Sequence, residues 1–431
     1  MRSVLLSTWL QLGFQAAAVL VAIPSVNAAE SMCLSFEDAL AIAADRDPNV
    51  STSRAERDIA AADLKEARSL FKPQVSAFGR TGVGDVGLVD GVIQNQVGVR
   101  ASQRLLDFGD AKYARLEARR NIDASTNDIR ASRIEAKLDA GFAYINILDA
   151  DARLAATKER SAYFENQLNA VEAALAGGGA TRSERADVAA QFADAQAFEL
   201  ELRFLKEQAQ TRLLLDIGAP PTVCSPESVE MSAETLFASV GSIEDAVADA
   251  LANSPNIRAL ENRTDAFEAA RKRESRARLP VISVVGLAAY SSTGSNGNFE
   301  LQDRVGIDVS VPLYTGAALS ARSGRAAARR ALANGEANAA RRRLEEDVSI
   351  LYRRILSMKA QLIRRTRVED EARKQFEAAQ IEFDNDARTL PDLVEIRLEY
   401  ENASLRRIAL RFDLLRQQLE LLALTARLVE D

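Results

Sequence analysis

Four acidic residues, two in each half of the chain, are matched in type and spacing. The matched pairs are Glu184 with Asp392 and Asp187 with Glu395, each 208 residues apart. Carboxylates that lie close together repel one another, so such a group needs a compensating cation. Arg388 is the candidate, because its counterpart in the first half is an uncharged alanine. The pattern predicts an electrostatic role; the alternative is ordinary solvated side chains at a helix turn.

Residues that usually carry out catalysis are scarce. The chain has no histidine, which removes the commonest general base and metal ligand. It also lacks the Gly-Lys pair of a phosphate-binding loop. The formal charge of -7 argues against a nucleic-acid-binding protein. We therefore predict that the chain is not an enzyme and that it binds no cofactor, metal or nucleic acid.

The first residues are typical of an export signal. Arg2 precedes an apolar run over 4–23, and Val26-Asn27-Ala28 fits a signal-peptidase site. A membrane anchor is the alternative, but Pro24 breaks the run and no basic cluster follows it. We therefore predict a signal peptide over 1–28. The rest of the chain has no apolar stretch of 18 residues, so no helix in it is expected to cross a membrane.

The remainder of the chain is a duplication. Ser35-Phe36-Glu37-Asp38-Ala39 recurs as Ser242-Ile243-Glu244-Asp245-Ala246, and Asp47-Pro48-Asn49 recurs as Ser254-Pro255-Asn256. The spacing is 207 residues in the early part and 208 later, so the halves keep register almost throughout. We predict two structural repeats, 34–218 and 242–428, joined by a linker over 219–241.

Each repeat predicts the same series of elements. A short helix leads into a longer one, whose Asp or Ser cap is followed by proline. A hairpin, a very long helix and a closing helix follow. The ranges in the first repeat are 35–45, 48–70, strands 73–80 and 92–106 around a turn at 81–91, then 111–176 and 183–217. In the second repeat the strands are 281–291 and 299–313 around a turn at 292–297, with helices at 317–384 and 391–428.

The expected strands are two-faced. Val305, Ile307, Val309 and Val311 alternate with glycine, Asp308 and serine. Such alternation fits a soluble sheet with one face on a core, and it fits a transmembrane barrel equally well. An open four-stranded sheet cannot lie in lipid, because its edge groups would be unpaired. A barrel would therefore need strands from several chains.

The expected long helices carry coiled-coil seams. Leu344, Val348, Leu351, Ile355, Met358 and Leu362 are spaced by alternating intervals of four and three residues. A helix of this length spans roughly 100 Å. So long and narrow a helix cannot bury its apolar stripe within one chain, which predicts an oligomer.

The order and duplication of these elements resemble the TolC family of outer-membrane efflux and secretion proteins. Local strings support the resemblance: Leu34 to Leu40, the joints Leu105-Leu106-Asp107-Phe108-Gly109 and Pro312-Leu313-Tyr314-Thr315-Gly316, and the helix turns at 179–184 and 387–392. The order Leu106-Asp107-Phe108 departs from the family's usual joint.

The resemblance implies a mixed α/β membrane protein. Three chains would form a twelve-stranded outer-membrane barrel, four strands from each, continued by a helical coiled-coil tunnel through the periplasm. A periplasmic adaptor and an inner-membrane pump, proton-driven or ABC, would dock at the tip of the tunnel and power efflux or type I secretion.

The resemblance also implies a gate at the two helix turns, at 177–184 and 385–392. Its residues would be Glu184, Asp187, Phe383, Arg388, Asp392 and Glu395, with Phe383 at the position of the family's gate tyrosine. In the implied topology Cys33 and Cys224 lie near one another, so a disulfide is expected, with two unpaired thiols as the alternative.

Two other hypotheses about the function remain open. An exported coiled-coil protein with a structural or adhesive role accounts for the heptads and the signal, but not for the duplicated hairpins. A soluble exported enzyme would need catalytic groups that the sequence does not supply.

Overall fold

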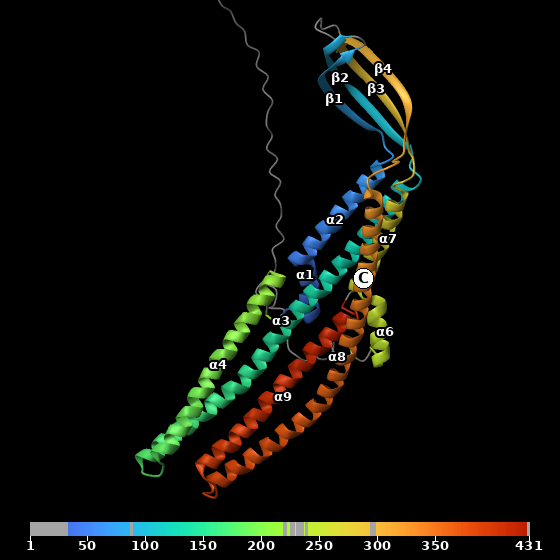
Figure 1. The fold of residues 1–431 in the computed structure, drawn as a ribbon. Coiled ribbons are helices and arrows are strands. Elements are labelled where there is room, and N and C mark those ends of the chain that lie inside the picture. Colours follow the sequence, from blue (N-terminus) through green and yellow to red (C-terminus); the bar gives the residue numbers. More distant parts are fainter. Residues whose placement is uncertain are drawn as a thin grey trace, which may run out of the picture.

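The chain forms a long helical column with a sheet at one end (Figure 1). The computed structural model describes residues 33–86, 89–218, 222–224, 229, 237, 240–293 and 299–428. The helices are α1 (Phe36–Arg46), α2 (Pro48–Ser69), α3 (Asp110–Ala176), α4 (Arg182–Ile217), α6 (Ile243–Asn253), α7 (Pro255–Arg276), α8 (Ala318–Asp384) and α9 (Leu390–Leu424). The strands are β1 (Gln74–Val86), β2 (Val89–Leu106), β3 (Val281–Thr293) and β4 (Phe299–Ser310). The expected signal peptide, 1–28, and most of the expected linker lie outside the described residues.

The two halves match element by element. Helices α1 and α6 each have 11 residues, α2 and α7 each have 22, and α3 and α8 each have 67. The side chains of Asp47 and Ser254 cap α2 and α7, and Pro48 and Pro255 follow them as the first helical residues. Proline fits there because that N–H has no partner within the helix in any case.

The four strands form one antiparallel sheet in the order β1-β2-β3-β4. The expected turn at 81–91 is wrong in extent, because β1 continues to Val86 and β2 begins at Val89. Thr81 and Gly82 pair with Asn95 and Gln94, so ladder hydrogen bonds override the turn preference of the glycines. At the other end β4 stops at Ser310 rather than at residue 313, close to Pro312, which has no N–H to donate.

One face of the sheet is apolar and exposed. The register places Val75, Ala101, Gly286 and Val305 in one row across the strands. Six large side chains on this face are between 55 and 81 % exposed, namely Val75, Val97, Leu301, Val305, Ile307 and Val309, and Tyr290 and Val99 beside them are 52 and 46 % exposed. The opposite face carries mostly polar residues, such as Ser76, Arg100, Ser283 and Asp308. A sheet whose apolar face covers no core is typical of a membrane barrel wall.

A short joint connects each hairpin to its long helix. At the first joint Phe108 and Gly109 both have positive φ, 51° and 108°. The Asp107 carboxylate is buried and accepts hydrogen bonds from the backbone N–H of Gly109 (3.1 Å) and Ala111 (2.8 Å). The unusual Leu106-Asp107-Phe108 order thus supplies a capping group for the first turn of α3.

The helical column is built from antiparallel pairs. Helix α3 packs against α2, α4, α7 and α9, while α8 packs against α6, α7 and α9. At 67 residues, α3 and α8 each span roughly 100 Å. Among the described residues, no helix combines the length and the apolar character needed to cross a bilayer.

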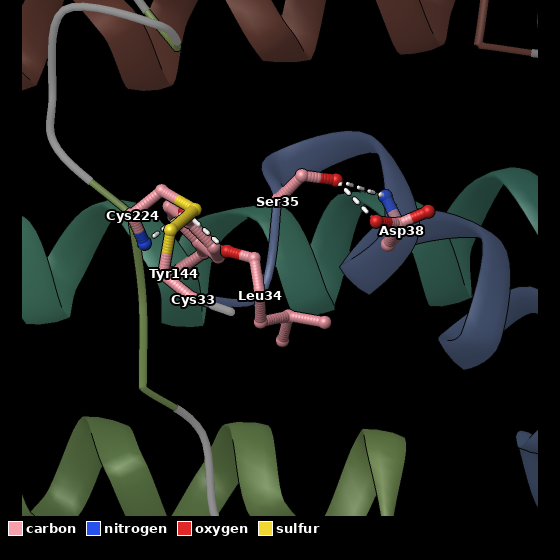
Figure 2. The surroundings of a disulfide bond; sticks show 6 residues. All are labelled: Cys33, Leu34, Ser35, Asp38, Tyr144 and Cys224. Carbon is pink, nitrogen blue, oxygen red and sulfur yellow. Dashed lines mark hydrogen bonds between the residues drawn. A yellow bond between two sulfur atoms is a disulfide. The ribbon is translucent and has the colours of Figure 1, made fainter. Parts of the chain in front are cut away.

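The main core lies at mid-height of the column, where the short helices α1 and α6 pack against the long ones. Tyr144, Ile355 and Phe412 are fully buried there. The chain ends of the first repeat meet beside this core: Cys33 and Cys224 form a disulfide, with their Cα atoms 4.9 Å apart (Figure 2).

Tyr144 ties this disulfide to α3. Its hydroxyl donates to the carbonyl oxygen of Leu34 (2.9 Å) and accepts from the backbone N–H of Cys224 (2.9 Å), as Figure 2 shows. Leu34 and Val223 also form a parallel β-bridge. Burial raises the pKa of Tyr144, so the hydroxyl keeps the proton that it donates.

We predict that thiol labelling of unreduced, denatured protein finds no reactive cysteine, whereas reduction exposes two per chain. Two reactive thiols without reduction would contradict the pairing.

Replacing Tyr144 by phenylalanine removes both hydrogen bonds and leaves the ring in place, and we expect a loss of about 1–3 kcal/mol in the free energy of unfolding. Chemical denaturation measures this loss, with Tyr113→Phe as the control.

Candidate functional site

The residues expected to form the gate lie at the end of the column remote from the sheet. Helices α3 and α4 turn back there through 177–181, and α8 and α9 through 385–389 (Figure 1). Gly178 and Asp386 occupy equivalent places in the two turns, with positive φ of 79° and 58°. Both hairpin turns are thus built alike.

The first turn is held by a capping box. The Thr181 hydroxyl accepts from the Glu184 N–H (3.2 Å), and the Glu184 carboxylate accepts from the Thr181 N–H (2.7 Å). The hydrogen bonds from Thr181 lower the pKa of Glu184, so this carboxylate is charged at neutral pH. Arg185 reaches across the turn to Glu172 on α3 (2.7 Å).

The second turn has part of this design, with a different ion pair. The Thr389 hydroxyl accepts from the Asp392 N–H (3.4 Å) and donates to the Asp392 carboxylate (2.7 Å). Arg388 donates to Glu382 on α8 through Nη2 (2.6 Å) and Nε (2.8 Å). Within the chain, then, the partner of Arg388 is Glu382, which the sequence analysis missed, and neither Asp392 nor Glu395. Phe383 is partly buried against the apolar residues between the hairpins.

Three of the four matched carboxylates border one groove. Glu184, Asp187 and Glu395 line a groove of about 270 Å³ between α4 and α9, while Asp392 lies on the adjoining turn. Val188, Leu390 and Val394 form the apolar part of its lining. Among the described residues no group of acidic side chains has the geometry to hold a metal ion. The arrangement can attract mobile cations to the tip and can repel its own copies.

A buried ionic cluster above the tip joins the two hairpins. Arg160 on α3 lies 3.1 Å from the Glu401 carboxylate on α9 and 2.8 Å from Asp194 on α4. Arg397 donates to Glu401 (2.6 Å). The guanidinium of Arg397 lies over the rings of Tyr163 (4.6 Å) and Phe376 (4.8 Å).

The sequence patterns did not lead us to predict this cluster, although the position of Glu401 was a sign of it. Glu401 continues the apolar seam of α9 backwards from Leu405 and Ile408 at the same spacing, where an apolar residue would be expected. Burial raises the pKa of Glu401, and the two arginines oppose this rise. Removing one partner of a buried ion pair costs about 3–5 kcal/mol, so the cluster fixes how the hairpins pack together.

Comparison with known proteins agrees with this architecture. The family model of outer membrane efflux proteins matches residues 39–219 and 246–427, one match in each repeat. The outer membrane efflux protein BepC of Brucella suis is 25% identical over 309 residues, which are 71% of this chain. The match spans 66% of BepC, slightly less than two thirds of its length.

Solved structures share the fold. The CmeC outer membrane channel of Campylobacter jejuni superposes with a TM-score of 0.77 at 15% identity, over 92% of this chain and 87% of CmeC. The MtrE outer membrane channel of Neisseria gonorrhoeae, in its open state, gives a TM-score of 0.74 at 17% identity, over 90% of this chain and 88% of MtrE. The chain therefore belongs to the outer membrane efflux protein family and is an outer-membrane protein that extends into the periplasm.

Proposed function

We propose that three copies of this chain form an exit duct, which passes substrates from an inner-membrane pump across the periplasm and the outer membrane. The observation that carries this proposal is the direct continuation of a two-faced sheet into a helical column roughly 100 Å long. The sheet supplies a wall that lipid can contact on one side, and the column is long enough to extend across the periplasm.

Closure of the barrel accounts for the assembly. The sheet has four strands, and β1 and β4 are its edges. Unpaired edge groups are not tolerated in hydrocarbon, so β1 of one copy must pair with β4 of the next. Three copies give twelve strands, enough for an open lumen.

The partners follow from the lack of an energy-coupling motif in the sequence. A periplasmic adaptor and a proton-driven or ABC pump would supply substrate and energy at the acidic tip. The name of BepC as an efflux protein favours efflux over type I secretion. Purification of the tagged chain from its own cells, with identification of the adaptor and pump that remain bound, distinguishes the two: an ABC exporter bound together with a secreted protein would overturn the efflux assignment.

We predict that Val309→Arg prevents assembly and that Asp308→Arg does not. Val309 is on the exposed apolar face of β4, where an arginine near the bilayer midplane costs roughly 2–4 kcal/mol; Asp308 is on the polar face. Cross-linking of outer-membrane fractions and conductance in planar bilayers measure trimer formation. Equal damage from the two substitutions, or an unaltered protein that forms no conducting trimer, would reject the barrel.

We predict that Arg388→Ser raises single-channel conductance, because Glu382 then adds an uncompensated charge to an acidic tip. Exposed ion pairs contribute only about 0–1 kcal/mol, so the tip opens readily. Arg373→Ser is the matched control, because Arg373 forms a comparable exposed pair with Asp370 on the same helix. If both variants conduct like the original protein, the gate does not lie at this turn.

We further predict that trivalent cations added on the periplasmic side block the current. The combined change Asp392→Asn and Glu395→Gln should weaken this block at least several-fold, because it removes six negative charges from a trimer. Glu336→Gln, an exposed position on α8 far from the tip, should leave the block intact. The measurement is current against cation concentration, and a block that survives neutralisation places the cation elsewhere.

A further inference from the structure

Positive charge is concentrated where the helices meet the sheet. We define the basic collar as residues 60–73, 107–120, 266–280 and 311–330, which adjoin the four strands through the ends of α2, α3, α7 and α8 (Figure 1). These stretches hold sixteen Lys and Arg against seven Asp and Glu, in a chain whose formal charge is -7. The collar is therefore opposite in sign to the rest of the molecule.

Several acidic groups of the collar are paired with its own arginines or with Arg104 on the adjoining strand β2. Asp110 pairs with Arg104 (2.9 Å) and Arg273 (3.2 Å). Glu268 pairs with Arg271 and Arg330, each at 2.9 Å, and the hydrogen bonds from Arg271 lower the pKa of Glu268 to about 2. The remaining basic groups thus have few carboxylates nearby to compensate them.

Six exposed basic side chains of the collar illustrate this excess. They are Lys72, Arg276, Arg278, Arg322, Arg325 and Arg329, and within the described part of the chain none has an ion pair with a carboxylate. The stretch 311–330 contains no acidic residue at all. Arg322 and Arg325 lie about 6 and 10 Å along α8 from its first residue, Ala318.

At its end nearest the sheet the collar includes exposed apolar and aromatic side chains. Leu313 and Tyr314 are 94 and 90 % exposed, and Phe108 at the equivalent joint is 43 % exposed. Aromatic residues favour the headgroup level of a bilayer, and lysine and arginine flank it. The joints therefore mark the boundary of the bilayer, and the collar begins at the depth of the lipid phosphates.

We propose that the basic collar binds the phosphate groups of anionic phospholipids in the periplasmic leaflet of the outer membrane. The proposal rests on the membrane barrel of the proposed function, since only a sheet in lipid brings these side chains to the headgroups. Arginine and lysine donate charge-assisted hydrogen bonds to phosphate, and each basic residue near an anionic surface strengthens binding about fivefold. The collar thereby fixes the depth of the barrel and recruits anionic lipid around it.

The test compares two triple variants of the full chain. The collar variant is Arg322→Gln with Arg325→Gln and Arg329→Gln. The control variant is Arg364→Gln with Arg365→Gln and Arg367→Gln, three exposed arginines in the second half of the same helix, remote from the collar. Each protein is reconstituted into vesicles of phosphatidylethanolamine mixed with phosphatidylglycerol, or of phosphatidylcholine alone. Native mass spectrometry then counts the retained lipids, and planar bilayers give conductance and ion selectivity.

We expect the original protein and the control variant to retain phosphatidylglycerol preferentially. The collar variant should lose this preference, with retention lower by about fivefold or more, and still form conducting trimers. Conducting trimers without any anionic preference in the original protein would overturn the collar proposal and leave the duct intact. Unchanged lipid retention with altered anion selectivity in the collar variant would overturn it too, because the arginines would then line the lumen. A protein that forms no conducting trimer would instead reject the barrel itself.

Discussion

The constraint on which the whole structure depends is that a backbone polar group in hydrocarbon must have a partner. The sheet satisfies this along three ladders of hydrogen bonds. Two of them, β1–β2 and β3–β4, lie within the hairpins, and the third, β2–β3, joins the two repeats. Among the described residues, the outer edges of β1 and β4 have no partner strand. The duplication therefore produces one part of a barrel, and only further copies complete it. The helical column depends on the same assembly, because its exposed apolar side chains, such as Leu200, Phe204 and Ile363, can be covered by a neighbouring copy.

Periodicity in the sequence predicted most of the fold, because long helices repeat the same physical pattern many times. The bounds of α3 and α8 agree with expectation to within one residue at each end. The turn at 81–91 was wrong because pairing with the partner strand, which is not local, overrides the preference of glycine for turns. The placement of the proposed gate residues at the two helix turns could be expected from the duplication. The pairing of Arg388 with Glu382 could not, since it depends on how a flexible side chain folds back over the turn.

The ionic cluster around Glu401 shows a kind of contact that sequence patterns do not predict. A carboxylate at a seam position is recognisable as an exception, and its partner Arg397 lies four residues earlier on the same helix. The other members of the cluster, however, come from three other helices that no spacing rule connects. Arg160 comes from α3, Asp194 from α4, and the aromatic ring of Phe376 from α8. A buried ion pair adds little stability compared with apolar packing, yet it tolerates few alternative arrangements. Its effect here is to fix the register between two hairpins whose apolar seams alone would permit sliding.

The two hairpins are chemically similar but are not held equally. Helix α3 packs on five other helices, α1, α2, α4, α7 and α9, whereas α8 packs on three, α6, α7 and α9. Over its lower half α8 packs mainly on α9, and this pair meets the first hairpin mainly through α9, at the Glu401 cluster and at the small apolar cluster of Phe164, Val188 and Val394. From α8 itself, Phe376 contacts Tyr163 of α3. If the tip is the gate that we propose, we therefore expect its opening to meet less resistance in α8 and α9 than in α3 and α4. The acidic groove between α4 and α9 lies across this same boundary, so repulsion among its carboxylates acts on the hairpin that is freer to move.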